Sequence, residues 1–191
     1  DCYGVACTEE AIELRNSGID KTPILLMEGV FEASELELIE KYNLIVTVCN
    51  SKQLQWLLDN KLNKPVDVFV KYDSGMGRLG FQGEEFINVI NLLEESEKIS
   101  QITLMTHFSS ADDLNSTSTN EQISNFDKTL YAKKYSTSLA NSAGIMSWSE
   151  SHREYTRPGI MLYGSSPFPE KKFLNKLTPA MTLSSVLISI K

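Results

Sequence analysis

The chain has 191 residues, which at roughly 150 residues per domain indicates one domain with a short appendage. Its 25 acidic and 18 basic residues give a formal net charge of −7, which argues against binding to nucleic acid or to an anionic membrane surface. No apolar run approaches the roughly 18 residues of a membrane span, and no basic stretch at the start marks a signal peptide. Three cysteines, without the spacing of a metal site, are expected as reduced thiols of a cytoplasmic protein.

Short apolar runs alternate with amphipathic segments along the chain. Helices are expected to begin near Thr8, Ser34 and Ser51, which are residue types that cap helix N-termini. Two more are expected over residues 86–93 and 123–130, where apolar side chains recur at a spacing of about 3.6 residues. The apolar runs predict strands at residues 3–7, 24–27, 44–48, 66–70, 102–105, 136–140 and 160–163.

Seven strands that alternate with helices predict an α/β fold with a parallel sheet. A doubly wound nucleotide-binding sheet is disfavoured, because no GxGxxG or P-loop motif follows the first strand. We therefore expect a (β/α)8 TIM-type barrel that is incomplete, with about seven of the eight strands present. Residues 1–178 would then form strands 2 to 8 of the barrel, and residues 179–191 a strand leading into a missing C-terminal β domain.

The loop at residues 71–81 holds the richest set of candidate functional residues, and barrel enzymes place their chemistry at the carboxyl ends of strands. One interpretation is a structural salt bridge among Lys71, Asp73 and Arg78. The alternative is a functional site, because Lys71 ends a strand that should be buried on both faces. A buried lysine must either pair with another group or change its chemistry.

Three more strand ends carry polar groups. His107 follows the fifth strand; a lone histidine there is more often structural than catalytic, although its position favours function. Ser142 precedes an expected helix start, where a hydroxyl and free N–H groups suit an anion. Arg157, Gly159 and Ile160 lie in the last loop, a region that frequently binds phosphate in barrels. Together these loops predict a cofactor that bears a phosphate.

These segments resemble the alanine racemase family, whose members are pyridoxal-phosphate enzymes with an N-terminal barrel. The resemblance covers nearly the whole chain in the family's order. Its most specific blocks are Asp-Ser-Gly-Met-Gly-Arg-Leu-Gly at residues 73–80 and Arg-Pro-Gly-Ile-Met-Leu-Tyr-Gly at residues 157–164. Shorter blocks lie at residues 4–11, 106–112, 140–143 and 179–181.

The resemblance implies supporting catalytic roles for three residues. Arg157 resembles the arginine that hydrogen-bonds the pyridine nitrogen of pyridoxal 5'-phosphate. His107 resembles the histidine that supports this arginine and the ring. Arg78 resembles the arginine near the phenolic oxygen of the cofactor and the carboxylate of the substrate.

The resemblance also implies cofactor contacts and one modification. Ser142, Gly159 and Ile160 resemble the phosphate contacts, beside the contacts of Arg157 to the ring. Lys71 resembles a lysine that many members carry as a carbamate. No metal ion is implied at any of these positions.

Two catalytic groups of the family have no counterpart here. The Schiff-base lysine belongs to a Lys-Ala-x-Ala-Tyr-Gly motif, which does not occur, and the second base is a tyrosine of a C-terminal domain contributed by the partner subunit. Racemisation needs both bases, because a proton leaves one face and returns to the other. The resemblance thus implies the barrel portion of a homodimeric racemase that interconverts L- and D-alanine for peptidoglycan precursors, inactive alone. A non-catalytic pyridoxal-phosphate homeostasis protein, or a racemase of another small amino acid such as serine, remain alternatives.

Overall fold

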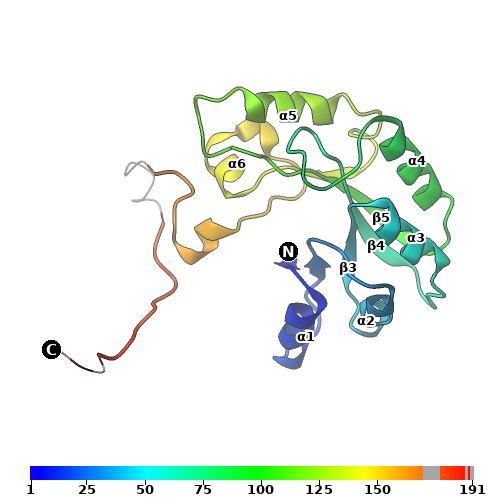
Figure 1. The fold of residues 1–191 in the computed structure, drawn as a ribbon, viewed down its shortest axis with the longest axis horizontal. Coiled ribbons are helices and arrows are strands. Elements are labelled where there is room, and N and C mark those ends of the chain that lie inside the picture. The colour runs from blue at the N-terminus through cyan, green and yellow to red at the C-terminus, as the bar shows by residue number, and fades with distance from the viewer. Residues whose placement is uncertain (170–176, 188, 190–191) are drawn as a thin grey trace.

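Six parallel strands form one sheet, and their spatial order follows their order in the chain (Figure 1). The computed structural model describes residues 1–169, 177–187 and 189. Each strand pairs in parallel with the next, which is the arrangement that consecutive βα units produce. The strands are β1 (Tyr3–Val5), β2 (Ile24–Leu26), β3 (Ile45–Val48), β4 (Val66–Lys71), β5 (Ile99–Met105) and β6 (Ser136–Ser138).

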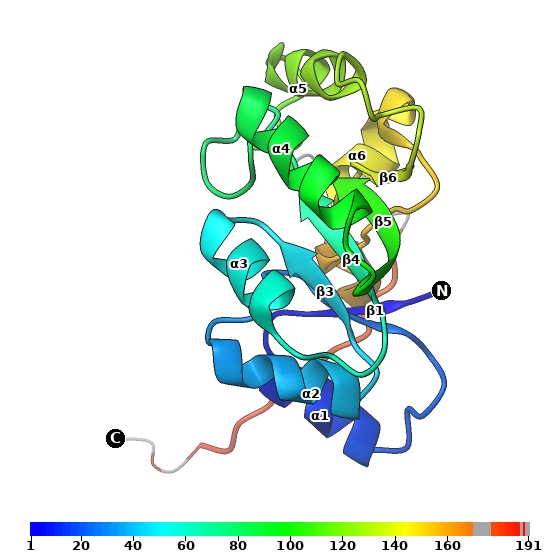
Figure 2. The same ribbon diagram turned by 90° about the vertical axis from the view of Figure 1, so that its right-hand side faces the viewer.

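Helices connect successive strands, and Figure 2 shows α3 and α4 packed along one side of the curled sheet. The result is an α/β fold in which the six strands form a half-barrel. The α-helices are α1 (Thr8–Asn16), α2 (Leu36–Lys41), α3 (Ser51–Asp59), α4 (Gly83–Glu94), α5 (Ser118–Asp127) and α6 (Ser142–Ser147). Three short 3-10 helices are η1 (Ala33–Glu35), η2 (Ser149–Ser151) and η3 (Ile160–Tyr163).

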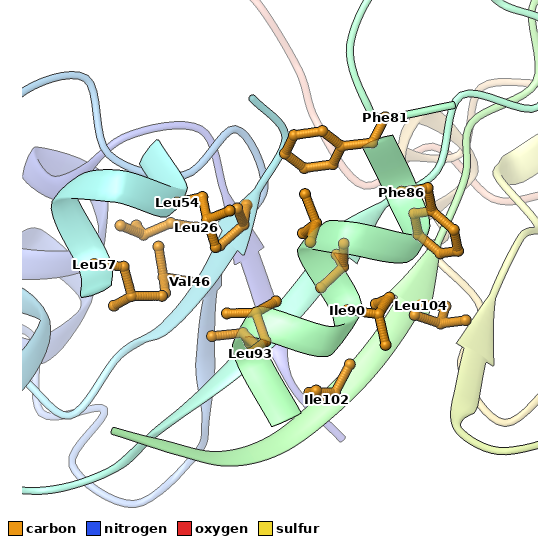
Figure 3. Packing of buried hydrophobic residues seen from close by; sticks show 14 of the residues in the cluster. Leu26, Val46, Leu54, Leu57, Phe81, Phe86, Ile90, Leu93, Ile102 and Leu104 are labelled. Atoms are coloured by element: carbon orange, nitrogen blue, oxygen red, sulfur yellow. The ribbon is translucent and has the colours of Figure 1, made fainter. Parts of the chain in front are cut away.

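The main hydrophobic core lies between the sheet and its covering helices. Alternate residues of a strand face the same side, so Val46, Val68 and Val70 all point toward the helices and are buried. Leu57 of α3 and Ile90 of α4 fill the space above them, as Figure 3 shows for Leu57 beside Val46. This packing fixes the positions of the strand ends that carry the polar residues.

The opposite face of the sheet carries a second, smaller cluster formed by Leu25, Phe69 and Met105. The ring of Phe69 packs edge-on against Tyr155, with 5.7 Å between the ring centroids. The chain after β6 therefore contacts this cluster at Tyr155. Strands β2, β3 and β4 are buried along nearly their whole length, so they are apolar runs rather than alternating sequences.

The expected seventh strand at residues 160–163 is wrong, since this apolar run forms the 3-10 helix η3. The chain pairs with β6 earlier, through a parallel bridge between Tyr155 and Ser138. Pro158 cannot donate to a strand ladder, and Gly159 follows it with a non-extended backbone (φ −108°, ψ −100°). Extension therefore stops before the apolar run begins, and only six strands are formed in the described part of the chain.

Helix boundaries differ from expectation by a few residues. Asn50, one residue before the expected cap Ser51, caps α3 by accepting a hydrogen bond from the N–H of Gln53 at 3.0 Å. Helix α5 ends at Asp127, so Leu130 lies beyond it and is 81% exposed. A sequence period therefore located these helices, while local hydrogen bonding decided where they begin and end.

The described residues 177–187 form no strand, and the tail extends away from the sheet (Figure 1, orange to red). It is attached to η3 by a hydrogen bond from the N–H of Ala180 to the carbonyl of Tyr163, at 3.1 Å. Gly164 permits this close approach, because a Cβ there would lie 2.1 Å from the carbonyl oxygen of Thr178. The division of the chain at residue 178 stays a prediction.

Among the described residues, no helix is long and apolar enough to cross a bilayer. The three cysteines are unpaired, and Cys49 is buried at the end of β3. No group of metal-ligating side chains that could hold an ion occurs in the described part of the chain.

Candidate active site

Arg157 lies at the carboxyl ends of β5 and β6, where main-chain carbonyl groups surround its guanidinium. Its Nη1 donates to the carbonyl of Ser138 at 2.8 Å and to the hydroxyl of the same residue. Its Nη2 donates to the carbonyls of Thr106 and Leu139, the latter at 3.1 Å. The remaining donor, Nε, is buried and has no hydrogen-bond partner within the described part of the chain.

An unpartnered buried N–H is rare in folded proteins and needs an explanation. Burial lowers the pKa of Arg157 to about 10, so the group still carries its charge at neutral pH. No carboxylate forms an ion pair with it among the described residues. The side chain is therefore fixed by its two terminal nitrogens and offers a charged N–H to a ligand acceptor.

Ser142 is the first residue of α6, whose N-terminus is capped by Asn141 through a 3.0 Å bond from the N–H of Gly144. Its hydroxyl accepts hydrogen bonds from the main-chain N–H of Gly159 at 2.9 Å and of Met161 at 3.4 Å. The structure thus brings the start of α6 and the start of η3 together. A phosphate group that took the place of the hydroxyl as acceptor for these N–H groups would find several donors at one point.

Ile160 is the first residue of η3, directly after Gly159. Its side chain is 50% exposed. The bond from the N–H of Gly159 to Ser142 brings the main chain of Ile160 near this hydroxyl. The expected contact of Ile160 with phosphate stays a prediction.

His107 follows the carboxyl end of β5 and is half-buried. Burial, together with the positive charges of Arg157, Arg78 and Lys71, lowers its pKa to about 4. The imidazole is therefore neutral at pH 7. Its ring makes no hydrogen bond to Arg157 or to any other described residue, while its carbonyl accepts one from Nε2 of Gln122 at 2.9 Å. Carbonyl groups, and not this ring, hold the arginine here.

Lys71 is the last residue of β4, in register with Met105 of β5, and is only 6% exposed. Burial lowers the pKa of its amine, and the nearby Cys49 and Glu28 partly oppose this shift. Its amino group makes no hydrogen bond or ion pair with the described residues. Burial thus shifts the lysine toward its uncharged amine, which is the form that reacts with electrophiles.

The loop of residues 72–80, which we call the Arg78 loop, is stabilised from within. The carboxylate of Asp73 accepts hydrogen bonds from the N–H of Gly75 at 3.1 Å and of Gly77 at 3.0 Å. The structural alternative of a salt bridge among Lys71, Asp73 and Arg78 is therefore wrong, since Asp73 is used by the loop's own backbone. Arg78 is exposed and forms no ion pair in the described structure.

A hollow separates the Arg78 loop from the end of β5. It brings together Lys71, Arg78 and His107, three of the residues selected from the sequence, and Thr106 links it to Arg157. Its lining consists of Lys71, Tyr72, Asp73, Met76, Arg78, Leu79, Thr106 and His107.

Sequence reasoning missed the residues that hold this site in place. Thr106 and Ser138 supply oxygen atoms to the guanidinium of Arg157, and both are buried at strand ends. Gln122 is a buried amide on the apolar face of α5 and was not singled out. The available signal was a polar residue inside an apolar pattern, which demands a hydrogen-bond partner.

The comparisons with known proteins agree on one family. A sequence model described as the N-terminal domain of alanine racemase matches residues 1–167. The catabolic alanine racemase of Pseudomonas putida is 42% identical over 192 residues, which cover 100% of this chain and 54% of that protein. The alanine racemase of an Azoarcus species is 40% identical over 191 residues, covering 100% and 53%.

Solved structures give the same result. The biosynthetic alanine racemase from Pseudomonas aeruginosa superposes with a TM-score of 0.89 and 36% identity, over 94% of this chain and 50% of that one. The alanine racemase from E. faecalis superposes with a TM-score of 0.77 and 30% identity, over 93% and 48%. The chain spans about half the length of the curated relatives it matches. It belongs to the alanine racemase family, and it corresponds to the N-terminal domain of that family.

Proposed function

We propose that this chain is the cofactor-binding barrel portion of an alanine racemase that uses pyridoxal 5'-phosphate. The observation that carries the proposal is the unpartnered Nε of Arg157, a buried N–H at the end of the sheet. A pyridine nitrogen is a neutral acceptor of the kind that this donor lacks. Family membership supports the same conclusion from the sequence.

The donors present fit both ends of that cofactor. Arg157 would bind the ring nitrogen, and Ser142 with the main chain of Gly159 and Ile160 would bind the phosphate. These groups lie on one connected segment, because the N–H of Gly159 donates to the hydroxyl of Ser142 two residues after Arg157. His107 would lie against the ring as a neutral imidazole.

Bound pyridoxal phosphate supplies an electron-withdrawing ring that makes the α-proton of an amino acid removable. Arg157 sets how strongly the ring withdraws, because an arginine stays protonated and can only donate. It therefore leaves the pyridine nitrogen without a proton and limits the spread of negative charge into the ring. This favours prompt return of the proton to the α-carbon over transamination, as racemisation requires.

Lys71 and Arg78 would serve the substrate side of the site. Carbon dioxide can add to the neutral amine of Lys71, forming a new N–C bond and releasing one proton to give a carbamate. This anion would orient Arg78, which would then face the carboxylate of alanine. Intact-mass measurement tests the modification directly, and a plain amine contradicts it.

The remaining machinery of the family would lie outside these residues. Supporting this, the chain spans about half of its relatives' length and lacks the Lys-Ala-x-Ala-Tyr-Gly motif. The full-length protein would close the half-barrel into a (β/α)8 barrel, add a C-terminal β domain, and form a cytoplasmic homodimer whose partner contributes a tyrosine. Its product would be D-alanine for peptidoglycan precursors.

The decisive experiment compares the 191-residue chain with the full-length protein from the same reading frame. We expect the full-length protein to convert L-alanine to D-alanine. We expect the chain alone to be inactive and to bind the cofactor weakly, with loss on dialysis. Arg157→Met should abolish this weak binding, and Arg153→Met, at a surface ion pair, should leave it unchanged.

Each competing outcome is recognisable. Borohydride reduction that labels a single lysine of the isolated chain, together with racemisation, would mean that the chain holds its own bases. A full-length protein that binds the cofactor without forming any D-amino acid would be the homeostasis protein instead. Preferential formation of D-serine would change the substrate and leave the site assignments intact.

A further inference from the structure

One buried amide links the two halves of the hollow. Gln122 of α5 is 2% exposed, and its Nε2 donates to the hydroxyl of Ser74 at 3.2 Å and to the carbonyl of His107 at 2.9 Å. Its Oε1 accepts from the N–H of Ser109 at 2.9 Å and from the hydroxyl of that residue at 3.2 Å. Both donors and both lone pairs of the amide are therefore used, which fixes its orientation.

The network continues on both sides of this amide. Ser74, in the Arg78 loop, shares a 2.7 Å hydrogen bond with the hydroxyl of Thr106 at the end of β5. The carbonyl of Thr106 in turn accepts a hydrogen bond from the guanidinium of Arg157. A continuous path of buried contacts thus runs from α5 through the loop to the arginine. Ser74 and Thr106 are 2% and 1% exposed, so water does not compete for these bonds.

Main-chain hydrogen bonds from Tyr72 to Met105 and from Gly80 to Cys49 hold the two ends of the loop, while α5 and Thr106 hold its inner part at Ser74. Its backbone has positive φ values at Gly75 (140°), Gly77 (72°) and Gly80 (117°). Glycine adopts these values without strain, but it does not restrict the backbone to them. The main-chain carbonyl of Ser74 accepts a hydrogen bond from the exposed Asn125, at 3.1 Å. Gln122 of α5 and Thr106 at the end of β5 therefore provide the buried anchor of the loop at Ser74.

We propose that Gln122 is a positioning residue that acts through Ser74, setting the distance of the Arg78 loop from the end of β5 and thereby the place of Arg78 in the site. This rests on the proposed function, in which Arg78 faces the substrate carboxylate. Gln122 touches neither the expected phosphate site at Ser142 nor Nε of Arg157, and its bond to His107 is to the main-chain carbonyl and not to the ring. Its loss should consequently weaken substrate binding more than cofactor binding.

The test uses Gln122→Met, which keeps the volume and removes the amide, in the full-length protein. We expect KM for L-alanine to rise about tenfold while kcat and cofactor affinity each change by less than about threefold, the pattern of a lost binding interaction. Ser74→Ala should reproduce the effect. The double variant should be little worse than either single one, because both changes remove the same contact.

Thr119→Val is the matched control, since Thr119 lies on the same helix, is fully buried, and has a hydroxyl without a partner in the described part of the chain. It should leave KM unchanged. Hydrogen exchange of the loop amides in the 191-residue chain gives a second readout, independent of activity. Exchange should be faster in Gln122→Met and Ser74→Ala than in Thr119→Val.

An unchanged KM in Gln122→Met, or effects that multiply in the double variant, would overturn the proposal while leaving racemase activity in place. If Gln122→Met does not fold, Ser74→Ala decides by the same KM criterion. A full-length protein without any racemase activity would refute the proposed function instead, and loop exchange would still decide whether Gln122 holds the loop.

Discussion

Two arginines at opposite ends of the sheet are each enclosed by main-chain carbonyl groups, yet they do different work. Arg15, at the end of α1, lies below the amino ends of β2 and β3, and all three of its nitrogens donate hydrogen bonds. Arg157, at the carboxyl ends of β5 and β6, uses only its two terminal nitrogens. The carbonyls around Arg15 belong to Ile19, Thr22, Tyr42 and Asn43, at 2.7, 2.8, 2.9 and 3.0 Å respectively.

Each guanidinium makes four hydrogen bonds with its five N–H donors, and the two differ in which N–H is left over. Arg15 leaves one N–H of Nη2, whose other contact is exposed to solvent, so its hydrogen bonds stabilise the fold. A guanidinium held equally firmly, with Nε left unpartnered, is oriented for a ligand without any need to reorganise. Under the proposed function, the amino end of the sheet would serve stability and the carboxyl end chemistry, as is usual in barrels built from βα units.

Replacing Arg15 with alanine should produce the largest loss of stability. Four carbonyl groups lose a charged donor, and the loops before β2 and β3 lose the contact that joins them. We expect the free energy of unfolding to fall by about 3 kcal/mol, as for loss of several hydrogen bonds to a charged group. Urea denaturation of the 191-residue chain measures this change.

The matched control is Arg153→Ala, which removes a surface ion pair with Asp127 at 2.8 Å. Its free energy of unfolding should change by less than about 1 kcal/mol. Equal losses in the two variants would mean that enclosure by carbonyls adds nothing over a surface contact, and the comparison would fail.

Arg157→Lys in the full-length protein should affect chemistry more than stability. A lysine keeps a charge but has one nitrogen, so it cannot occupy both the carbonyl groups and the ring nitrogen. We expect turnover to fall about tenfold to hundredfold, with more transamination products, as when a bond made during the reaction is lost. Chiral analysis of the products measures both. An unchanged rate and product ratio would remove Arg157 from the ring nitrogen.

Ser142→Ala should act on cofactor affinity alone. The variant removes the hydroxyl that joins α6 to the N–H of Gly159. We expect the free energy of cofactor binding to weaken by about 1 to 3 kcal/mol, the cost of removing a partner from a charged acceptor. Turnover at saturating cofactor should change much less. A loss of turnover with unaltered affinity would place Ser142 outside the phosphate site.

The sequence predicted the central strands of the sheet better than the segment that follows β6. The runs around Val46, Val68 and Val70 became strands because burial on both faces demands apolar residues there. The run at 160–163 was equally apolar and became η3, because the preceding Pro158 and Gly159 end the extended backbone. Composition cannot separate the two cases, since the difference lies in residues outside the run.

The site shows the same division. Spacing and resemblance placed Arg157 and Ser142 in loops that the structure does bring near each other, through Gly159. Nothing in the sequence indicated that Nε of Arg157 would be left unpartnered, because this depends on carbonyl groups of three different residues that accept from the other nitrogens. Gln122 was missed for a related reason: its partners are 13 to 48 positions away in the chain.

The smallest expected effect concerns His107, which tests whether positive charges gather at the carboxyl end of the sheet. Its pKa of about 4 lies below the ordinary 6.5, so between these pH values the imidazole is protonated in the unfolded chain and neutral in the folded chain. Stability must therefore fall as the pH drops from 6.5 toward 4. Between pH 7 and pH 5.5 this amounts to about 1 kcal/mol. Urea denaturation at both pH values measures this loss. In His107→Gln, whose side chain does not titrate, the free energy of unfolding should fall by about 1 kcal/mol less between the two pH values. Equal pH dependence in both proteins would mean that the imidazole titrates normally and that the positive charges of Arg157, Arg78 and Lys71 do not converge on it.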